Sequence, residues 1–201
     1  MGPDAPKRAV FKIFAAAACL LFIAGCQTVN LNRAVTGTAC ATRSRCLKDM
    51  NLPNPAAPRY VFVVGPYTFN ETAKGSLGTS FGTTYRGDVE LCVARALARE
   101  FGDRAKVVFD SKGLAGPYAG IRITRADFHS DYTMGWHMQI DYTLTYGGKS
   151  VPLAARTGIK NFLSARQAAE TQYLAACGIL ARQVKENLGG MGIDSSKEVI
   201  H

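Results

Sequence analysis

An alternating pattern of apolar and polar side chains after residue 135 constrains the fold more than any other feature of this chain. Its apolar positions are Trp136, Met138, Ile140, Tyr142 and Leu144. A period of two residues is typical of a strand with one buried face. Gly147 and Gly148 then predict a two-residue hairpin turn that leads into a second strand.

This turn determines which residues of the two strands face each other. The predicted pairs are Leu144 with Val151, Tyr142 with Leu153, Ile140 with Ala155 and Trp136 with Ile159. Because the apolar positions of both strands then share one face, the register is strongly specified. The opposite face pairs Gln139 with Arg156 and is polar.

Apolar periodicity predicts the remaining elements. We expect strands over 60–64, 106–110 and 120–128, and helices over 87–101 and 164–188. The first strand, the first helix and the second strand predict a right-handed parallel crossover. One apolar sheet face with two helices to cover it predicts an α+β two-layer sandwich. Its mixed sheet has about five strands, and the expected order is β-α-β-β-β-α.

Residues 66–86 follow neither period and predict a long glycine-rich loop, a kind of segment that is often functional. Within it, residues 78–82 match G-x-S-x-G, the nucleophile elbow of serine hydrolases. The elbow needs its serine at a sharp strand-to-helix turn, whereas Ser80 lies inside the predicted loop. A flexible loop is therefore the preferred interpretation, and a serine hydrolase built on Ser80 is the least favoured function.

The N-terminus carries a short basic region followed by an apolar run. Residues 13–26 contain no charged side chain. A helix that spans a bilayer needs about 20 apolar residues, so the length of this run is typical of an export signal that is later removed. The run ends in Ile23-Ala24-Gly25-Cys26, which resembles the lipobox of bacterial lipoproteins.

The lipobox resemblance implies a diacylglyceryl group on the thiol of Cys26 and removal of residues 1–25 as a signal peptide. An ordinary signal peptide with a chance cysteine and an uncleaved short anchor are the alternatives. In enteric-type lipoproteins an aspartate after the cysteine retains the protein at the inner membrane, and here Gln27 occupies that position. The resemblance therefore implies an anchor at the periplasmic face of the outer membrane.

Composition divides the rest of the chain. Residues 26–58 are polar and end with three prolines in six residues, which predicts a lipidated N-terminus followed by a semi-rigid tether. Residues 59–190 are expected to form the periplasmic α+β domain. Residues 191–201 are expected to be a flexible tail.

The charge of the chain is strongly positive, with a formal net value of +9. Removal of residues 1–25 takes three of the 24 basic and one of the 15 acidic residues, which leaves 176 residues and a net charge of +7. This surplus favours anionic lipid headgroups, glycolipid phosphates or acidic partners, whereas an exported chain seldom meets nucleic acid. The candidate contact residues on the polar face of the sheet are Arg122, Arg125, Arg156 and Lys160. Ordinary solvated surface charge is the alternative.

Four cysteines follow the signal and the anchor: Cys40, Cys46, Cys92 and Cys177. An even number in an exported chain predicts disulfides, with three pairings open. We favour Cys40–Cys46, because both lie in one short polar segment, and Cys92–Cys177, because both fall on apolar faces of predicted helices. Free thiols packed as small apolar groups are the alternative for the second pair.

No cofactor or metal is predicted. His129 and His137 flank the turn between two predicted strands, but two imidazoles alone make a poor metal site, so a surface pair is the preferred interpretation. Trp136 and the tyrosines at positions 132, 142 and 146 are candidates to line a ligand groove. Trp136 and Tyr142, however, occupy core positions of their strand.

The element order, behind a lipobox and a polar tether, resembles that of small envelope lipoproteins such as LptE and the YajG type. The likeness is closest over residues 136–188, and the cysteine pairs and the glycine-rich loop depart from it. The anchor, the tether, the basic surplus and the lack of a catalytic constellation in the sequence favour a non-enzymatic, membrane-anchored lipoprotein that binds an envelope protein or a glycolipid as an assembly or transport accessory. The alternative is a periplasmic protein that shelters an apolar or anionic small molecule between the sheet and residues 66–86.

Overall fold

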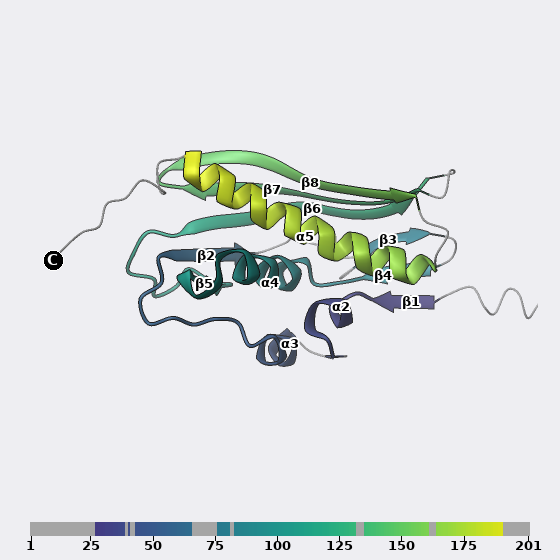
Figure 1. Ribbon diagram of the computed structural model, residues 1–201, viewed down its shortest axis with the longest axis horizontal. Coiled ribbons are helices and arrows are strands. Elements are labelled where there is room, and N and C mark those ends of the chain that lie inside the picture. Colours follow the sequence, from purple (N-terminus) through teal and green to yellow (C-terminus); the bar gives the residue numbers. More distant parts are fainter. Residues whose placement is uncertain are drawn as a thin grey trace, which may run out of the picture.

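The computed structural model describes residues 27–38, 40, 43–65, 76–80, 83–131, 135–160 and 164–190. Figure 1 shows the arrangement of the elements in this part of the chain. Its strands are β1 (Gln27–Asn30), β2 (Tyr60–Gly65), β3 (Ser76–Ser80), β4 (Thr83–Arg86), β5 (Ala105–Val108), β6 (Ala119–Ser130), β7 (Gly135–Tyr146) and β8 (Lys149–Lys160). Its helices are α2 (Asn32–Thr36), α3 (Arg43–Met50), α4 (Val89–Phe101) and α5 (Ala165–Gly190), with a 3₁₀ turn, η2 (Gly102–Arg104), after α4.

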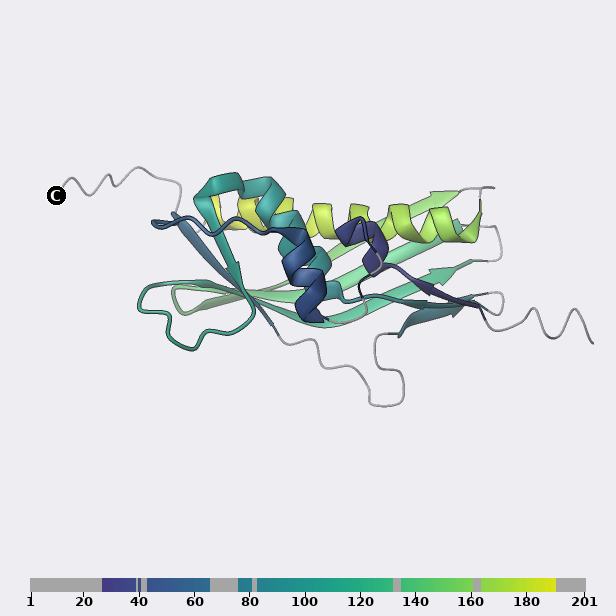
Figure 2. The ribbon, with the colours of Figure 1, turned by 90° about the horizontal axis from the view of Figure 1, so that it is seen from below.

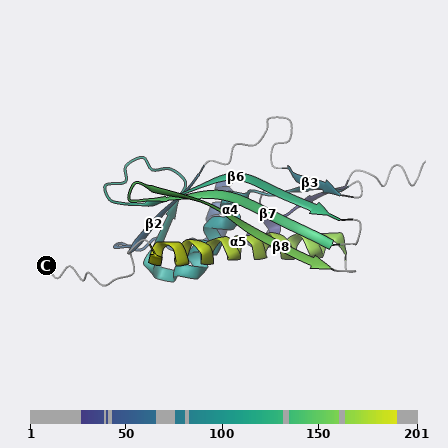
Figure 3. The same ribbon diagram turned by 90° about the horizontal axis from the view of Figure 1, so that it is seen from above.

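The α+β class is confirmed. A five-stranded mixed sheet has the strand order β5-β2-β6-β7-β8, in which β2 runs parallel to both β5 and β6 and the remaining neighbours are antiparallel. Figure 2 and Figure 3 show α4 and α5 on the same side of this sheet. Four strands lie between α4 and α5 in the chain, which agrees with the predicted strand ranges, so the expected order β-α-β-β-β-α omits one strand.

The register of the β7–β8 hairpin is as the sequence predicts. Leu144 pairs with Val151, Ile140 with Ala155 and Trp136 with Ile159. Gly147 and Gly148 have φ angles of 55° and 78°, which glycine adopts without the steric cost that a β-carbon brings. The turn chemistry and the buried face therefore specify the same pairing.

The prediction of one long loop over residues 66–86 is wrong for its second half. There β3 and β4 form an antiparallel pair, and β1 adds to β4 in parallel to make a second, three-stranded sheet. Gly78 has a φ of 147°, and a β-carbon there would overlap the carbonyl oxygen of Phe128 on β6. At least one of the glycines that suggested a loop is thus needed for a close approach between two strands.

Aromatic side chains join the two sheets. The ring of Tyr85 on β4 lies 4.7 Å from that of Phe128 on β6, and Phe128 lies 5.6 Å from Trp136 on β7. All three side chains are buried. Aromatic pairs at such distances stabilise a fold beyond the area they bury.

The expectation of a tether over residues 26–58 is also wrong for most of the described part of that segment. Residues 27–30 are a strand of the smaller sheet, and α2 and α3 follow. Leu31 and Val35 are fully buried, and the Leu31 amide donates to the carbonyl of Arg86 at 2.7 Å. Residues 51–59 are the longest described run in this stretch without a helix or strand, so the folded unit includes residues from Gln27 onward.

The two long helices bury the faces that their periodicity predicts. Asp88 precedes α4 as its N-cap: its carboxylate accepts a hydrogen bond from the Leu91 amide at 3.3 Å. The buried positions of α5 include Ala169, Tyr173, Ala176, Cys177, Leu180, Val184 and Leu188. Within the described ranges, no helix has the length and apolarity that crossing a bilayer requires.

Candidate functional site

Several residues that the sequence singles out lie outside the described part of the chain. Cys26, Tyr132, the side chain of Ser80 and the expected tail over 191–201 belong to this group. The backbone at Ser80 is described: it ends β3, and the next element, β4, is a strand. The strand-to-helix turn of a nucleophile elbow is therefore not the context of Ser80.

Both predicted disulfides are present. Cys40 and Cys46 are bonded with their Cα atoms 5.2 Å apart, and Cys92 and Cys177 are bonded with theirs 6.0 Å apart. All four side chains are buried. The first bond joins Cys40 to Cys46 within α3, whereas the second joins α4 to α5 across 85 residues of sequence.

A polar cluster attaches the N-terminal segment to the start of α4. Arg43 of α3 forms an ion pair with the buried Glu90 and lies 3.8 Å from a carboxylate oxygen of Asp88. The Asp88 amide donates to the side-chain oxygen of Asn32 at 2.6 Å. The guanidinium of Arg43 also covers the ring of Phe109 at 4.6 Å. The cluster has a clear structural role, because it supplies partners for two carboxylates that the fold removes from water.

Burial governs ionisation in this region. Burial raises the pKa of the Asp88 carboxyl, and the nearby Arg43 guanidinium opposes that rise. The pKa of the fully buried Tyr173 hydroxyl is also raised, by burial and then by the charge of Asp88. Both groups are thus stabilised in their neutral forms.

The four predicted contact residues lie on the face of the sheet that α4 and α5 leave uncovered. They are Arg122 and Arg125 on β6 and Arg156 and Lys160 on β8. All four are exposed, but β7 separates the two pairs and places Asp141 opposite Arg125. Arg125 also lies 3.2 Å from Asp127. Acidic side chains of β6 and β7 therefore lie beside Arg125 on this face.

The two strand histidines lie side by side. His129 and His137 face each other across β6 and β7, with ring centroids 5.2 Å apart. His137 contacts Asp131 at 2.9 Å and His129 contacts Asp127 at 3.4 Å. No group of three or more metal-ligating side chains occurs among the residues that the structure describes.

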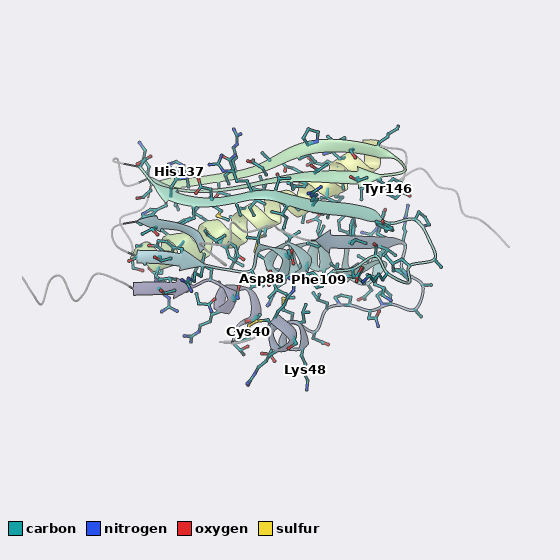
Figure 4. All side chains as sticks on the ribbon, turned by 180° about the vertical axis from the view of Figure 1, so that it is seen from behind. Cys40, Lys48, Asp88, Phe109, His137 and Tyr146 are labelled. Atoms are coloured by element: carbon teal, nitrogen blue, oxygen red, sulfur yellow. A yellow bond between two sulfur atoms is a disulfide. The ribbon has the colours of Figure 1, made fainter. Side chains whose placement is uncertain are left out.

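The aromatic candidates for a ligand groove belong to the core. Trp136 and Tyr142 are buried, and Tyr146 is half-buried against the same core. The hydroxyl of Tyr142 donates to the side-chain oxygen of Gln183 on α5 at 3.1 Å, and burial raises its pKa. Figure 4, which views the uncovered face, labels His137 and Tyr146 near opposite ends of this sheet.

A groove on the helix side of the molecule is the candidate binding site. It has a volume of about 410 Å³, within the range of small-molecule sites. Its lining comes from α2, α4 and α5: Ala34, Val35, Cys92, Arg95, Ala96, Arg99, Glu100, Leu174, Cys177, Gly178, Ala181 and Arg182. The walls thus combine small apolar side chains, one disulfide and three arginines.

Sequence reasoning missed this groove. No role was predicted for Arg95 and Arg99, which are half-buried and exposed, respectively, on α4. Sequence reasoning also had no helix over 32–36, which supplies one wall of the groove. Arg95 and Arg99 lie four residues apart on one helix, and side chains at this spacing point in the same direction. This spacing is the signal for the groove that the sequence contains.

Comparisons with known proteins leave the family open. No family model matches the chain, and no curated protein matches it in sequence. A crystal structure of an uncharacterised protein is similar, with a TM-score of 0.48, 10% identity, and coverage of 66% of this chain and 94% of that one. Protein XCC0632 from Xanthomonas campestris, described under the family model DUF330, has a TM-score of 0.46 at 13% identity, with 72% and 93% covered.

A PelC dodecamer from Paraburkholderia phytofirmans is similar at a lower level. Its TM-score is 0.33 at 13% identity, and the match covers 64% of this chain and 92% of that one. Because all three scores lie below 0.5, these likenesses support no statement about function.

Proposed function

We propose that this protein is a lipoprotein of the bacterial envelope, anchored through Cys26, whose folded domain binds partners and does not catalyse a reaction. The observation that carries the proposal is the N-terminal pattern, in which a short basic region and an uncharged run end in Ile23-Ala24-Gly25-Cys26. Each methylene of an acyl chain that enters a bilayer contributes about 0.8 kcal/mol, so two or three chains hold a protein at the membrane.

The two disulfides support an exported location. Cys40–Cys46 and Cys92–Cys177 are both buried bonds of the folded unit, and disulfides persist mainly in oxidising compartments. The net charge of +7 expected after removal of residues 1–25 also suits a surface that displays anionic groups.

The finer assignments follow from the lipobox resemblance. Gln27 favours the periplasmic face of the outer membrane, and the likeness to LptE and the YajG type favours an assembly or transport accessory that binds an envelope protein or a glycolipid. A ligand-binding role is the second candidate, and the groove lined by Arg95, Arg99 and Arg182 favours it.

Metabolic labelling with an alkyne analogue of palmitate tests the proposal. Cells that produce the wild-type chain are expected to yield a labelled protein in the outer-membrane fraction, because acylation and anchoring depend on the same thiol. The Cys26→Ser variant is expected to lose the label and to leave that fraction. An unlabelled wild-type protein, or a variant that keeps both properties, contradicts the proposal.

A further inference from the structure

Three cationic side chains line the groove, and no acidic side chain of the described part of the chain forms an ion pair with them. They are Arg95, Arg99 and Arg182. The acidic residue of the lining, Glu100, is bound to Lys185 at 2.8 Å. The groove therefore has a positive charge that its own side chains leave available to an anion.

The disulfide between the helices fixes where these cations lie. Arg95 follows Cys92 by three residues on α4, and Arg182 follows Cys177 by five residues on α5. Since the bond ties the two helices together just ahead of the arginines, the spacing of the backbone that carries them does not depend on a flexible loop. A preformed arrangement of cations lowers the cost of binding an anion.

The remaining lining is apolar. Leu174 is 40% exposed, which is unusual for a large apolar side chain, and the half-buried Ala34 and Ala96 lie on the other two helices. An inorganic anion gains nothing from these apolar contacts. An amphiphile, whose charged group is attached to an apolar part, contacts both the arginines and the apolar side chains.

The position of the groove in the chain connects it with the membrane. Ala34, in the α2 wall, follows Cys26 by eight residues. Because an extended chain spans at most about 3.6 Å per residue, Ala34 lies within about 30 Å of residue 26. The proposed anchor would therefore hold the groove close to the headgroups of its own leaflet.

From these observations we infer that the groove between α2, α4 and α5 binds the phosphate headgroup of an anionic membrane lipid. The three guanidinium groups contact the phosphate, and the adjoining apolar part of the lipid packs on Leu174 and Ala34. This inference rests on the proposed envelope location, which supplies the lipid, and it assigns a ligand class to the binding role.

Calorimetric titration of the full-length protein, purified in a non-ionic detergent, tests the inference. The probe is dihexanoyl-phosphatidylglycerol, and the comparisons are dihexanoyl-phosphatidylcholine and inorganic phosphate. We expect the anionic lipid to bind at least about tenfold more tightly than either, because only it combines a net negative charge with an apolar part.

Two kinds of groove variant and one matched control locate the site. Arg99→Gln with Arg182→Gln is expected to weaken binding of the lipid about tenfold or more. Gly178→Phe is expected to weaken it similarly while keeping every charge, since a β-carbon at that position meets no atom within 4 Å and the ring fills the groove. The control, Arg86→Gln with Arg166→Gln, removes two exposed arginines outside the groove and is expected to change affinity by less than about twofold.

Four results would overturn the inference. The first is an unchanged lipid affinity in both groove variants with the fold intact, and the second is an equal loss of lipid affinity in the control. The third is a loss of lipid affinity that occurs only in Arg122→Gln with Arg156→Gln, on the sheet face. The fourth is binding of inorganic phosphate as tight as that of the lipid. An unchanged unfolding temperature and an intact disulfide establish that each variant folds. The titration does not depend on acylation of Cys26, so its failure is separate from failure of the labelling experiment.

Discussion

Two regions of the molecule differ in what holds them in place. The hairpin of β7 and β8 with helix α5 takes its structure from its own pattern, because the turn, the register and the buried faces all follow from residues close in sequence. The segment over 27–50 is polar, and its helices have only five and eight residues. Helices of that length are unstable alone, so contacts with distant residues hold this segment, among them Arg43 with Glu90 and Asn32 with Asp88.

The largest effect is expected from the disulfide of the C-terminal region. Cys92→Ala with Cys177→Ala opens a loop with a sequence separation of 85 and is expected to lower the free energy of unfolding by about 4–5 kcal/mol. Cys40→Ala with Cys46→Ala, at a separation of 6, is expected to cost about 2 kcal/mol. Urea unfolding of both variants measures the difference, and equal costs would show that chain entropy does not set their contributions.

Removal of the ion pair tests whether the N-terminal segment is part of the cooperative unit. Arg43→Ala leaves the buried Glu90 without this partner and is expected to cost about 1–3 kcal/mol, since the guanidinium itself is partly exposed. The control is Lys48→Ala on the same helix, which removes an exposed charge and is expected to change stability by less than about 0.5 kcal/mol. Identical unfolding midpoints for the two variants would mean that residues 27–50 unfold independently of the rest.

The hairpin turn provides the matching test of local control. Gly148→Ala places a β-carbon at a φ of 78° and is expected to cost about 1–2 kcal/mol. Lys149→Ala, one residue later and exposed, is expected to be nearly neutral. If thermal unfolding gave the same stability for both variants, the turn would not determine the register of β7 and β8.

A stabilising change is expected on α5. Gly178→Ala adds a β-carbon in open space within the helix and is expected to raise the free energy of unfolding by about 0.5–1 kcal/mol. The same urea titration measures it. A loss of stability would indicate that the backbone at Gly178 is not the regular helix described.

The smallest effect concerns Asp88 and depends on pH. Because burial raises its pKa in the folded state, the folded protein holds this proton more tightly than the unfolded chain. The contribution of protonated Asp88 to stability is complete below about pH 3.9, the pKa of this carboxyl in the unfolded chain. It is lost as the pH rises through the pKa of Asp88 in the folded protein. Asp88→Asn keeps a capping oxygen and removes the titration, so the stability of the variant relative to wild type is expected to increase between pH 4 and pH 7. A relative stability that falls over this interval contradicts the direction of the shift.

Sequence reasoning succeeded where neighbours in the chain decide the structure. The strand alternation and the Gly-Gly turn predicted the register of β7 and β8, the placement of Cys92 and Cys177 on apolar helix faces predicted their bond, and the short separation of Cys40 and Cys46 predicted theirs. It failed where contacts between residues far apart in the chain determine the structure. The polar segment over 27–50 gains its structure by packing on α4 and β4, and Gly78 is required by Phe128, 50 residues away. The groove could not be predicted either, because it needs α2 beside two helices whose relative placement the sequence does not encode locally.

The mass of the N-terminal peptide of the purified mature protein tests the proposed anchor most directly. The account predicts a peptide that begins at Cys26 and has the mass of a diacylglyceryl group and an N-linked acyl chain added to it. A peptide that begins at any other residue, or an unmodified Cys26, would contradict the account.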